Sequence, residues 1–270
     1  HSEMTTRRLA APLTLLISAF IAGCGGGGGQ ASSTTATPSP ESATPTTPAP
    51  APASTPRTAG LWEGQSPTAR ATHIVMLDDG RLFFLYSTIA DPTLMGGAIV
   101  GLLTNSGLSY VSQVAYDFDW EGMAAQTGTL TASIDNQSGF NGSMNYTTNA
   151  DRAFSFSSSY LPPSTRSVTL ADVAGPYANS DRTMTMDIDA KGGVTGVAFA
   201  QKCAFAGTVV PTRNYTNILH IALSFAGGGC PLGTNTVEGI AIYNPERKEL
   251  LGTAVTATGN SVAMFQTRKP

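Results

Sequence analysis

The chain is poor in charge, in histidine and in cysteine. Charged side chains make up only 12% of its 270 residues, and it has 3 histidines and 3 cysteines. A nucleic-acid-binding domain needs a basic patch, which a weakly acidic chain with a formal net charge of −3 does not supply. We therefore expect no nucleic-acid partner, and we expect no cofactor.

The motifs of common catalytic machineries are also missing. There is no Gly-x-Ser-x-Gly nucleophile elbow, and no Ser-x-x-Lys motif falls at the start of a helix. His73 and His220 each lie within a strand pattern, where a lone histidine is usually structural. The sequence thus predicts that the chain is not an enzyme.

Helical periodicity is nearly absent, which points to an all-β fold. Apolar residues come instead in short runs bounded by Gly, Asn, Asp and Pro, a pattern typical of strands and turns. One short helical turn is expected at 170–173. The expected strands span 72–77, 81–87, 97–103, 108–116, 127–134, 139–146, 152–160, 183–189, 194–200, 204–210, 218–225, 236–244, 250–257 and 262–266.

Two halves of the β region begin alike. Gly60-Leu61-Trp62 opens the first and Gly175-Pro176-Tyr177 opens the second, and an apolar strand and an Asp/Gly turn follow each opener. Such a start is typical of small antiparallel barrels. We expect two antiparallel β-barrel or sandwich modules, over 58–165 and 166–270. A single larger sandwich or barrel is the alternative.

The N-terminus has the pattern of an export signal. His1, Ser2 and Glu3 precede the first methionine and are interpreted as the remnant of a tag. Arg7 and Arg8 then lead into an apolar stretch that is long enough for a signal peptide but too short to span a membrane comfortably. Residues 1–23 are therefore assigned to the tag remnant and signal.

The end of this stretch, Ile21-Ala22-Gly23-Cys24, resembles the bacterial lipobox. The resemblance implies that the thiol of Cys24 receives a diacylglycerol and that the chain is anchored to a membrane through this lipid. By resemblance to lipoprotein sorting, Gly25 after the cysteine implies the outer membrane. The membrane is thus the first expected partner.

Residues 24–57 are expected to form a disordered tether behind the lipid. Between Gly25 and Arg57 there is no Leu, Ile, Val or aromatic residue. Such a segment cannot bury enough apolar surface to offset the entropy lost on ordering. The alternation of proline and alanine from Pro48 to Pro52 favours extended polyproline II.

Cys203 and Cys230 remain as an even pair once Cys24 is assigned to the lipid. In an oxidising compartment such a pair is expected to form a disulfide.

The acidic string Asp117-Phe118-Asp119-Trp120-Glu121 is the candidate for a metal site. On a strand, Asp117, Asp119 and Glu121 share one face, where three carboxylates would suit a hard cation. The favoured interpretation is an amphipathic edge strand with the acids outward and the aromatic residues inward, and no metal.

The span 59–268 resembles a family of exported proteobacterial lipoproteins whose function is not established. The residues that carry the likeness are the opener Gly60 to Gly64, the Asp79-Gly80 turn, the segment Cys203 to Thr208 with Pro211, Cys230, and Gly239 to Tyr243. More loosely, a glycine-rich stretch after a lipidated cysteine followed by barrel modules is similar to the architecture of surface lipoproteins that bind transferrin or factor H.

Together these features predict a cell-envelope binding or interaction lipoprotein, exposed at the surface or on the periplasmic side of the outer membrane. The partner would be a host protein, an envelope protein or a glycan, and the chain would be a candidate surface antigen. The alternative is a lipocalin-like carrier that holds a small apolar ligand inside a barrel.

Overall fold

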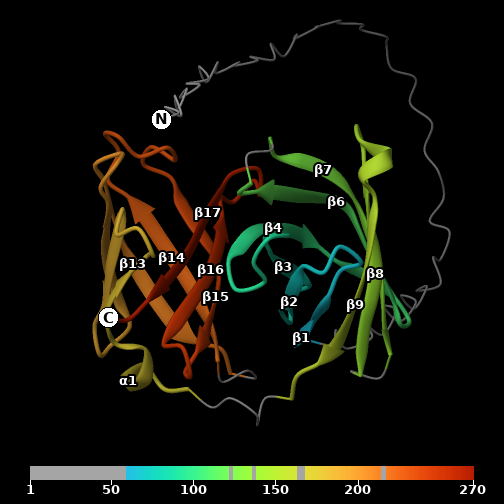
Figure 1. Cartoon of the computed structure of the whole chain (residues 1–270), viewed down its shortest axis with the longest axis horizontal. Helices are drawn as coiled ribbons and strands as arrows, with labels where there is room; N and C mark the ends of the chain where they lie inside the picture. The colour runs from blue at the N-terminus through green and yellow to red at the C-terminus, as the bar shows by residue number, and fades with distance from the viewer. Residues whose placement is uncertain (1–58, 122–123, 136–137, 163–167, 214–216) are drawn as a thin grey trace, which may run out of the picture. The chain divides into compact units, whose positions relative to one another are not determined.

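The computed structural model describes residues 59–121, 124–135, 138–162, 168–213 and 217–270. These residues form an all-β structure of two antiparallel eight-stranded barrels, shown in blue to yellow-green and in yellow to red in Figure 1. The predicted fold class, two small β modules, is confirmed. None of the helices in the described ranges is long and apolar enough to cross a membrane.

The first barrel closes through a pairing of β4 with β6. The strand order is β4-β3-β2-β1-β9-β8-β7-β6, and short β5 adds to the edge of β6. A 3-10 turn, η1 (Ala150–Arg152), precedes the last strand of this barrel. The strands are β1 Gly60–Gln65, β2 Ala71–Met76, β3 Arg81–Ser87, β4 Met95–Leu102, β5 Thr104–Ser106, β6 Ser109–Asp119, β7 Gln126–Asp135, β8 Gly139–Tyr146 and β9 Phe154–Tyr160.

The second barrel follows the chain strand by strand, with α1 (Leu170–Val173) as the predicted helical turn before it. Thr169 caps this turn in a capping box with Asp172. The strands are β10 Gly175–Ala178, β11 Met184–Ile188, β12 Gly193–Ala198, β13 Cys203–Pro211, β14 Ile218–Phe225, β15 Thr236–Asn244, β16 Glu249–Val255 and β17 Val262–Arg268.

Tight turns with glycine join the hairpins where the sequence predicts them. At the β2–β3 turn, Gly80 has a φ of 85°. The side chain of Asp79 accepts a hydrogen bond from the N–H of Arg81 at 2.9 Å. This left-handed backbone suits glycine because a side chain would be strained there.

Both barrels are filled by side chains. The first holds an aromatic cluster, with Trp62 packed against Phe140 at a ring distance of 5.2 Å and Phe84 against Phe156 at 4.9 Å. The second holds mainly aliphatic side chains around Tyr177. The two openers thus enter the two interiors, since Trp62 and Tyr177 are 0% and 2% exposed.

A third apolar cluster lies between the barrels. It joins outward-facing residues of the first barrel, such as Phe83 and Val75, to Ile218, Ile240 and Ile242 of the second. Strand β3 is therefore buried on both faces, and its apolar residues run without alternation. By contrast, β7 alternates between buried and exposed residues because one face meets solvent.

The expected strands match the observed ones to within a few residues, with three exceptions. The two openers are themselves the first strands, β1 and β10, and the expected turn at 104–107 contains β5. In each case the segment is short or rich in Gly, Pro or polar residues, so its β propensity is low. Pairing with a neighbouring strand then decides the conformation.

Candidate functional site

An open groove of about 1110 Å³ lies where residues of both barrels meet. Its first wall comes from loops of the first barrel, with Thr93 and Leu94 before β4 and Trp120 after β6. Its second wall comes from strands β10 to β13 and the end of β17. Residues of both barrels therefore line the groove, and most of them belong to the second barrel.

The first wall presents apolar side chains to solvent. Trp120 is 48% exposed and Leu94 is 44% exposed. The backbone N–H of Trp120 donates to the carbonyl of Gly96 at 2.7 Å, which fixes the position of this loop beside β4. Exposed large apolar side chains that line a groove are typical of a contact surface.

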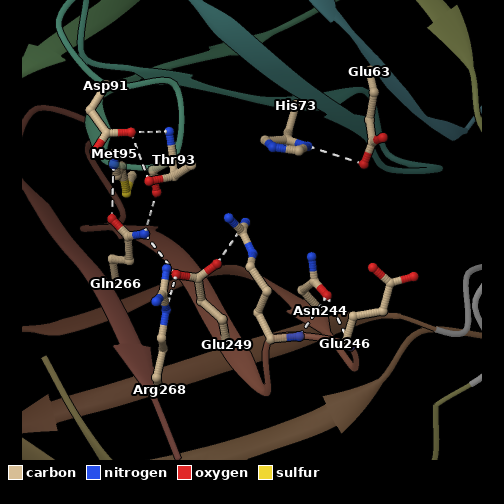
Figure 2. Close-up of polar contacts among 11 residues, drawn as sticks. Glu63, His73, Asp91, Thr93, Met95, Asn244, Glu246, Glu249, Gln266 and Arg268 are labelled. Atoms are coloured by element: carbon tan, nitrogen blue, oxygen red, sulfur yellow. Dashed lines mark hydrogen bonds and ion pairs between the residues drawn. The ribbon is translucent and has the colours of Figure 1, made fainter. Parts of the chain in front are cut away.

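A polar network holds the two walls of the groove together, as Figure 2 shows. The side chain of Gln266, on β17, reaches the loop before β4 in the other barrel. Its Oε1 accepts from the N–H of Met95 at 2.8 Å, and its Nε2 donates to the carbonyl of Thr93 at 2.7 Å. Gln266 also donates to Glu249 at 2.8 Å, which ties the network to β16.

Glu249 is the buried anion of this network, with 0% exposure. Its carboxylate pairs with Arg268 at 2.9 Å and with Arg247 at 2.7 Å. A buried carboxylate is tolerated only when cations and hydrogen bonds compensate its lost hydration. Here they do, so the side chains at the base of the groove are preorganised.

The predicted acidic string lies at the mouth of the first barrel, and its first acid points inward. Asp117 is buried, and its two oxygens accept hydrogen bonds from the hydroxyls of Tyr86 at 2.7 Å and Tyr146 at 2.5 Å. Burial raises the pKa of Asp117, although both tyrosine hydrogen bonds act against this. Burial and the nearby Asp117 also raise the pKa of both tyrosines.

The other acids of the string have separate partners. Glu121 forms an ion pair with Arg70 at 2.6 Å, and the guanidinium of Arg70 lies over the ring of Tyr86. Asp119 accepts a hydrogen bond from the N–H of Glu121 at 2.7 Å. In the described ranges, no group of three His, Cys, Asp or Glu residues is placed to hold a metal ion.

The expected orientation of this strand is wrong. We expected the acids outward and the aromatic residues inward, but Asp117 faces the barrel interior and Phe118 packs into the cluster between the barrels. The alternation of the strand is as expected. The second barrel gives the outer face an apolar environment, and the two tyrosines satisfy the acid inside.

The remaining candidate residues lie apart from one another. His73 contacts Glu63 at 3.2 Å between Nδ1 and Oε1, and His220 is exposed on β14. Cys203 and Cys230 form the predicted disulfide, with sulfurs 2.06 Å apart. Cys24, the predicted lipidation site, lies outside the described residues.

The sequence does not predict the groove, although five residues of its lining lie in motifs named above: Trp120, Pro176, Tyr177, Ala204 and Phe205. The unbroken apolar run Leu82-Phe83-Phe84-Leu85 indicates that something packs against the outside of this strand, because a strand that is apolar on both faces must be covered on both. Which strands cover it is a tertiary property. No protein-family model matches the chain, and no curated protein matches it.

Proposed function

We propose that the chain is a lipid-anchored envelope protein that binds a macromolecular partner in the groove between its two barrels. The observation that carries this proposal is an open groove of about 1110 Å³ outside two filled barrels. Lipidation at Cys24 and an outer-membrane location remain predictions from the lipobox resemblance. The tether would let the groove reach a partner away from the membrane.

The groove has the chemical composition of a contact surface. Trp120 and Leu94 are exposed apolar side chains beside the buried ionic network of Glu249 and Gln266. Aromatic residues with surrounding polar groups are enriched in protein interfaces. The groove is open and involves both barrels, which suits an extended or convex partner.

A carrier that encloses an apolar ligand is the second candidate, and the barrel interiors argue against it. The cavity at the mouth of the first barrel is about 180 Å³, and its lining includes Asp117, Arg70 and Gln126. Small-molecule pockets are usually about 300–1,000 Å³ and mostly apolar. An apolar ligand would need to displace the packed side chains.

The proposal is tested by photo-crosslinking in living cells of the source organism. p-Benzoylphenylalanine is placed at Leu94 in the groove or, as the control, at exposed Asn141 on β8. We expect a discrete crosslinked product of one mass from the Leu94 position and none from the Asn141 position. Equal products from both positions, or none from either, would contradict binding in the groove.

Two companion measurements separate the remaining alternatives. Native mass spectrometry of the purified chain tests the carrier, which would retain an apolar ligand of defined mass. Protease treatment of intact cells tests the location, because a surface-exposed chain is digested and a periplasmic chain is protected until lysis. A protected chain would exclude host partners but leave binding to an envelope component in place.

A further inference from the structure

Strand β17 is paired along its whole length on one side only. On the β16 side, the register runs through seven residue pairs, from Glu249 with Arg268 to Val255 with Val262. On the other side, β10 contributes a single pair, Ala178 with Arg268. The closure of the second barrel therefore leaves most of one edge of β17 without a neighbouring strand.

The alternation of hydrogen bonds between β16 and β17 shows which residues of β17 direct their backbone N–H and C=O groups to the open edge. The N–H of Lys269 donates to Lys248 at 3.0 Å, and the N–H of Thr256 donates to Ser261 at 3.0 Å, one bond beyond each end of the pair. In an antiparallel pair, hydrogen-bonded positions alternate with positions that point away. Residues 263, 265 and 267 therefore bond to β16.

Val262, Met264 and Gln266 are the residues that direct their N–H and C=O groups to the other side. No described strand pairs with them there, because β10 ends at Ala178, where the chain turns towards β11. All three are only partly buried. A strand edge with free donors and acceptors is a template for another extended backbone.

One end of this edge borders the groove. Gln266 belongs to its lining, as do Arg268 and Ala178, which marks the end of β10. The side chains of Val262 and Met264 pack against the apolar cluster between the barrels. Leu94 and Trp120 form the facing apolar wall. An extended segment paired with β17 would therefore lie beside side chains that can pack against its alternate residues.

We propose that the partner of the groove is an extended polypeptide segment, which adds as a strand to the open edge of β17. This inference rests on the proposed binding function and narrows its partner to a protein. Main-chain hydrogen bonds supply affinity in such strand addition, and alternate side-chain contacts supply selectivity. A glycan has no backbone that can continue the ladder.

The test begins with a displayed library of linear dodecapeptides, selected on the full chain in detergent. Selected peptides are synthesised and their affinities measured with the chain and with two variants, Met264→Pro and Met264→Leu. Proline removes an N–H that β16 does not use, and edge strands tolerate proline at such positions. Leucine changes the same side chain but keeps the N–H.

We expect Met264→Pro to weaken binding about tenfold, the effect of losing one hydrogen bond of about 1.4 kcal/mol. Met264→Leu should retain the affinity. Peptides that bind both variants equally would overturn strand addition, and so would failure to select any peptide. Circular dichroism establishes that both variants are folded.

A scan of the peptide's own backbone keeps the test decisive if the proline variant does not fold. Each peptide N–H is replaced in turn by N–CH₃. Strand addition predicts that affinity falls at every second position, because alternate N–H groups point to β17. Uniform tolerance would reject strand addition. Crosslinking at Leu94 would decide separately whether the groove binds a partner at all.

Discussion

The two barrels have the same number of strands but are closed in different ways. The first closes through five residue pairs between β4 and β6, from Gly97 with Asp119 to Gly101 with Ala115. The second closes through the single pair of Ala178 with Arg268. Full closure removes strand edges, whereas partial closure leaves one that another chain can use. The first barrel therefore resembles a scaffold, and the second contains the proposed recognition edge.

The two barrels also differ in the interactions that stabilise them. The first barrel is filled by an aromatic cluster and has a buried acid held by two tyrosines at its mouth. The second has a more aliphatic interior and the disulfide between Cys203 and Cys230. A covalent bond thus lies in the barrel with the shorter seam, and the Gln266 network ties that barrel to its neighbour.

The largest expected effect comes from removing the disulfide. The double variant Cys203→Ala/Cys230→Ala should lower the unfolding free energy of the second barrel by about 3–4 kcal/mol, because the bond constrains the unfolded chain. The cysteines are 27 residues apart. In urea denaturation, part of the circular dichroism should be lost before the fluorescence of buried Trp62 changes. The fluorescence reports on the first barrel, since both tryptophans are there.

Cys24→Ala is the control for that experiment, because it removes the third cysteine and leaves the disulfide intact. An unchanged urea midpoint in the double variant would show that the bond does not stabilise the second barrel. Simultaneous loss of both signals at lower urea would show that the two barrels unfold as one unit.

A smaller effect is expected from breaking the contact between the barrels. Gln266→Leu should lower the free energy of unfolding by about 1–3 kcal/mol, because it leaves the N–H of the buried Met95 without its partner. Gln113→Leu, at an exposed position on β6, is the matched control. In calorimetry, the control should unfold in a single transition. In Gln266→Leu this transition should broaden or divide into two. Identical transitions would mean that the apolar cluster alone couples the barrels.

The smallest effect concerns the pH dependence of the first barrel. Because the pKa of Asp117 is raised in the folded chain, that state binds the proton more tightly than the unfolded chain. The contribution of this group to stability is therefore greatest below its usual pKa of 3.8 and declines as the pH rises above it.

Asp117→Asn should remove this decline, because asparagine does not titrate there. The measurement is the difference in unfolding free energy between the chain and the variant across pH 3–8, which cancels the contribution of all other acids. A difference that stays constant with pH would contradict a raised pKa for Asp117.

Much of the fold follows from local sequence patterns. The apolar runs placed most strands to within a few residues, the Asp79-Gly80 turn marked a hairpin, and the cysteine pair predicted the disulfide. These features depend on near neighbours or on simple pairing chemistry. The sequence does not predict β1 and β10 as strands, because strands rich in glycine or proline acquire their conformation from a partner.

The candidate site was far less accessible from the sequence. Alternation correctly placed Asp117 and Phe118 on opposite faces of one strand, but it could not say which face would be inside. That choice depends on the tyrosines supplied by β3 and β8 and on the second barrel outside. The groove likewise combines Trp120 and Gln266, which are distant in sequence.

The sequence by itself determined an all-β chain with two similar halves, its turns and its disulfide, because these arise from local conformational preferences and an even pair of thiols. The tertiary structure alone decided the inward direction of Asp117, the groove and the open edge of β17. Each of these depends on where a barrel closes and on what packs against its outside, and both are set by contacts between distant segments.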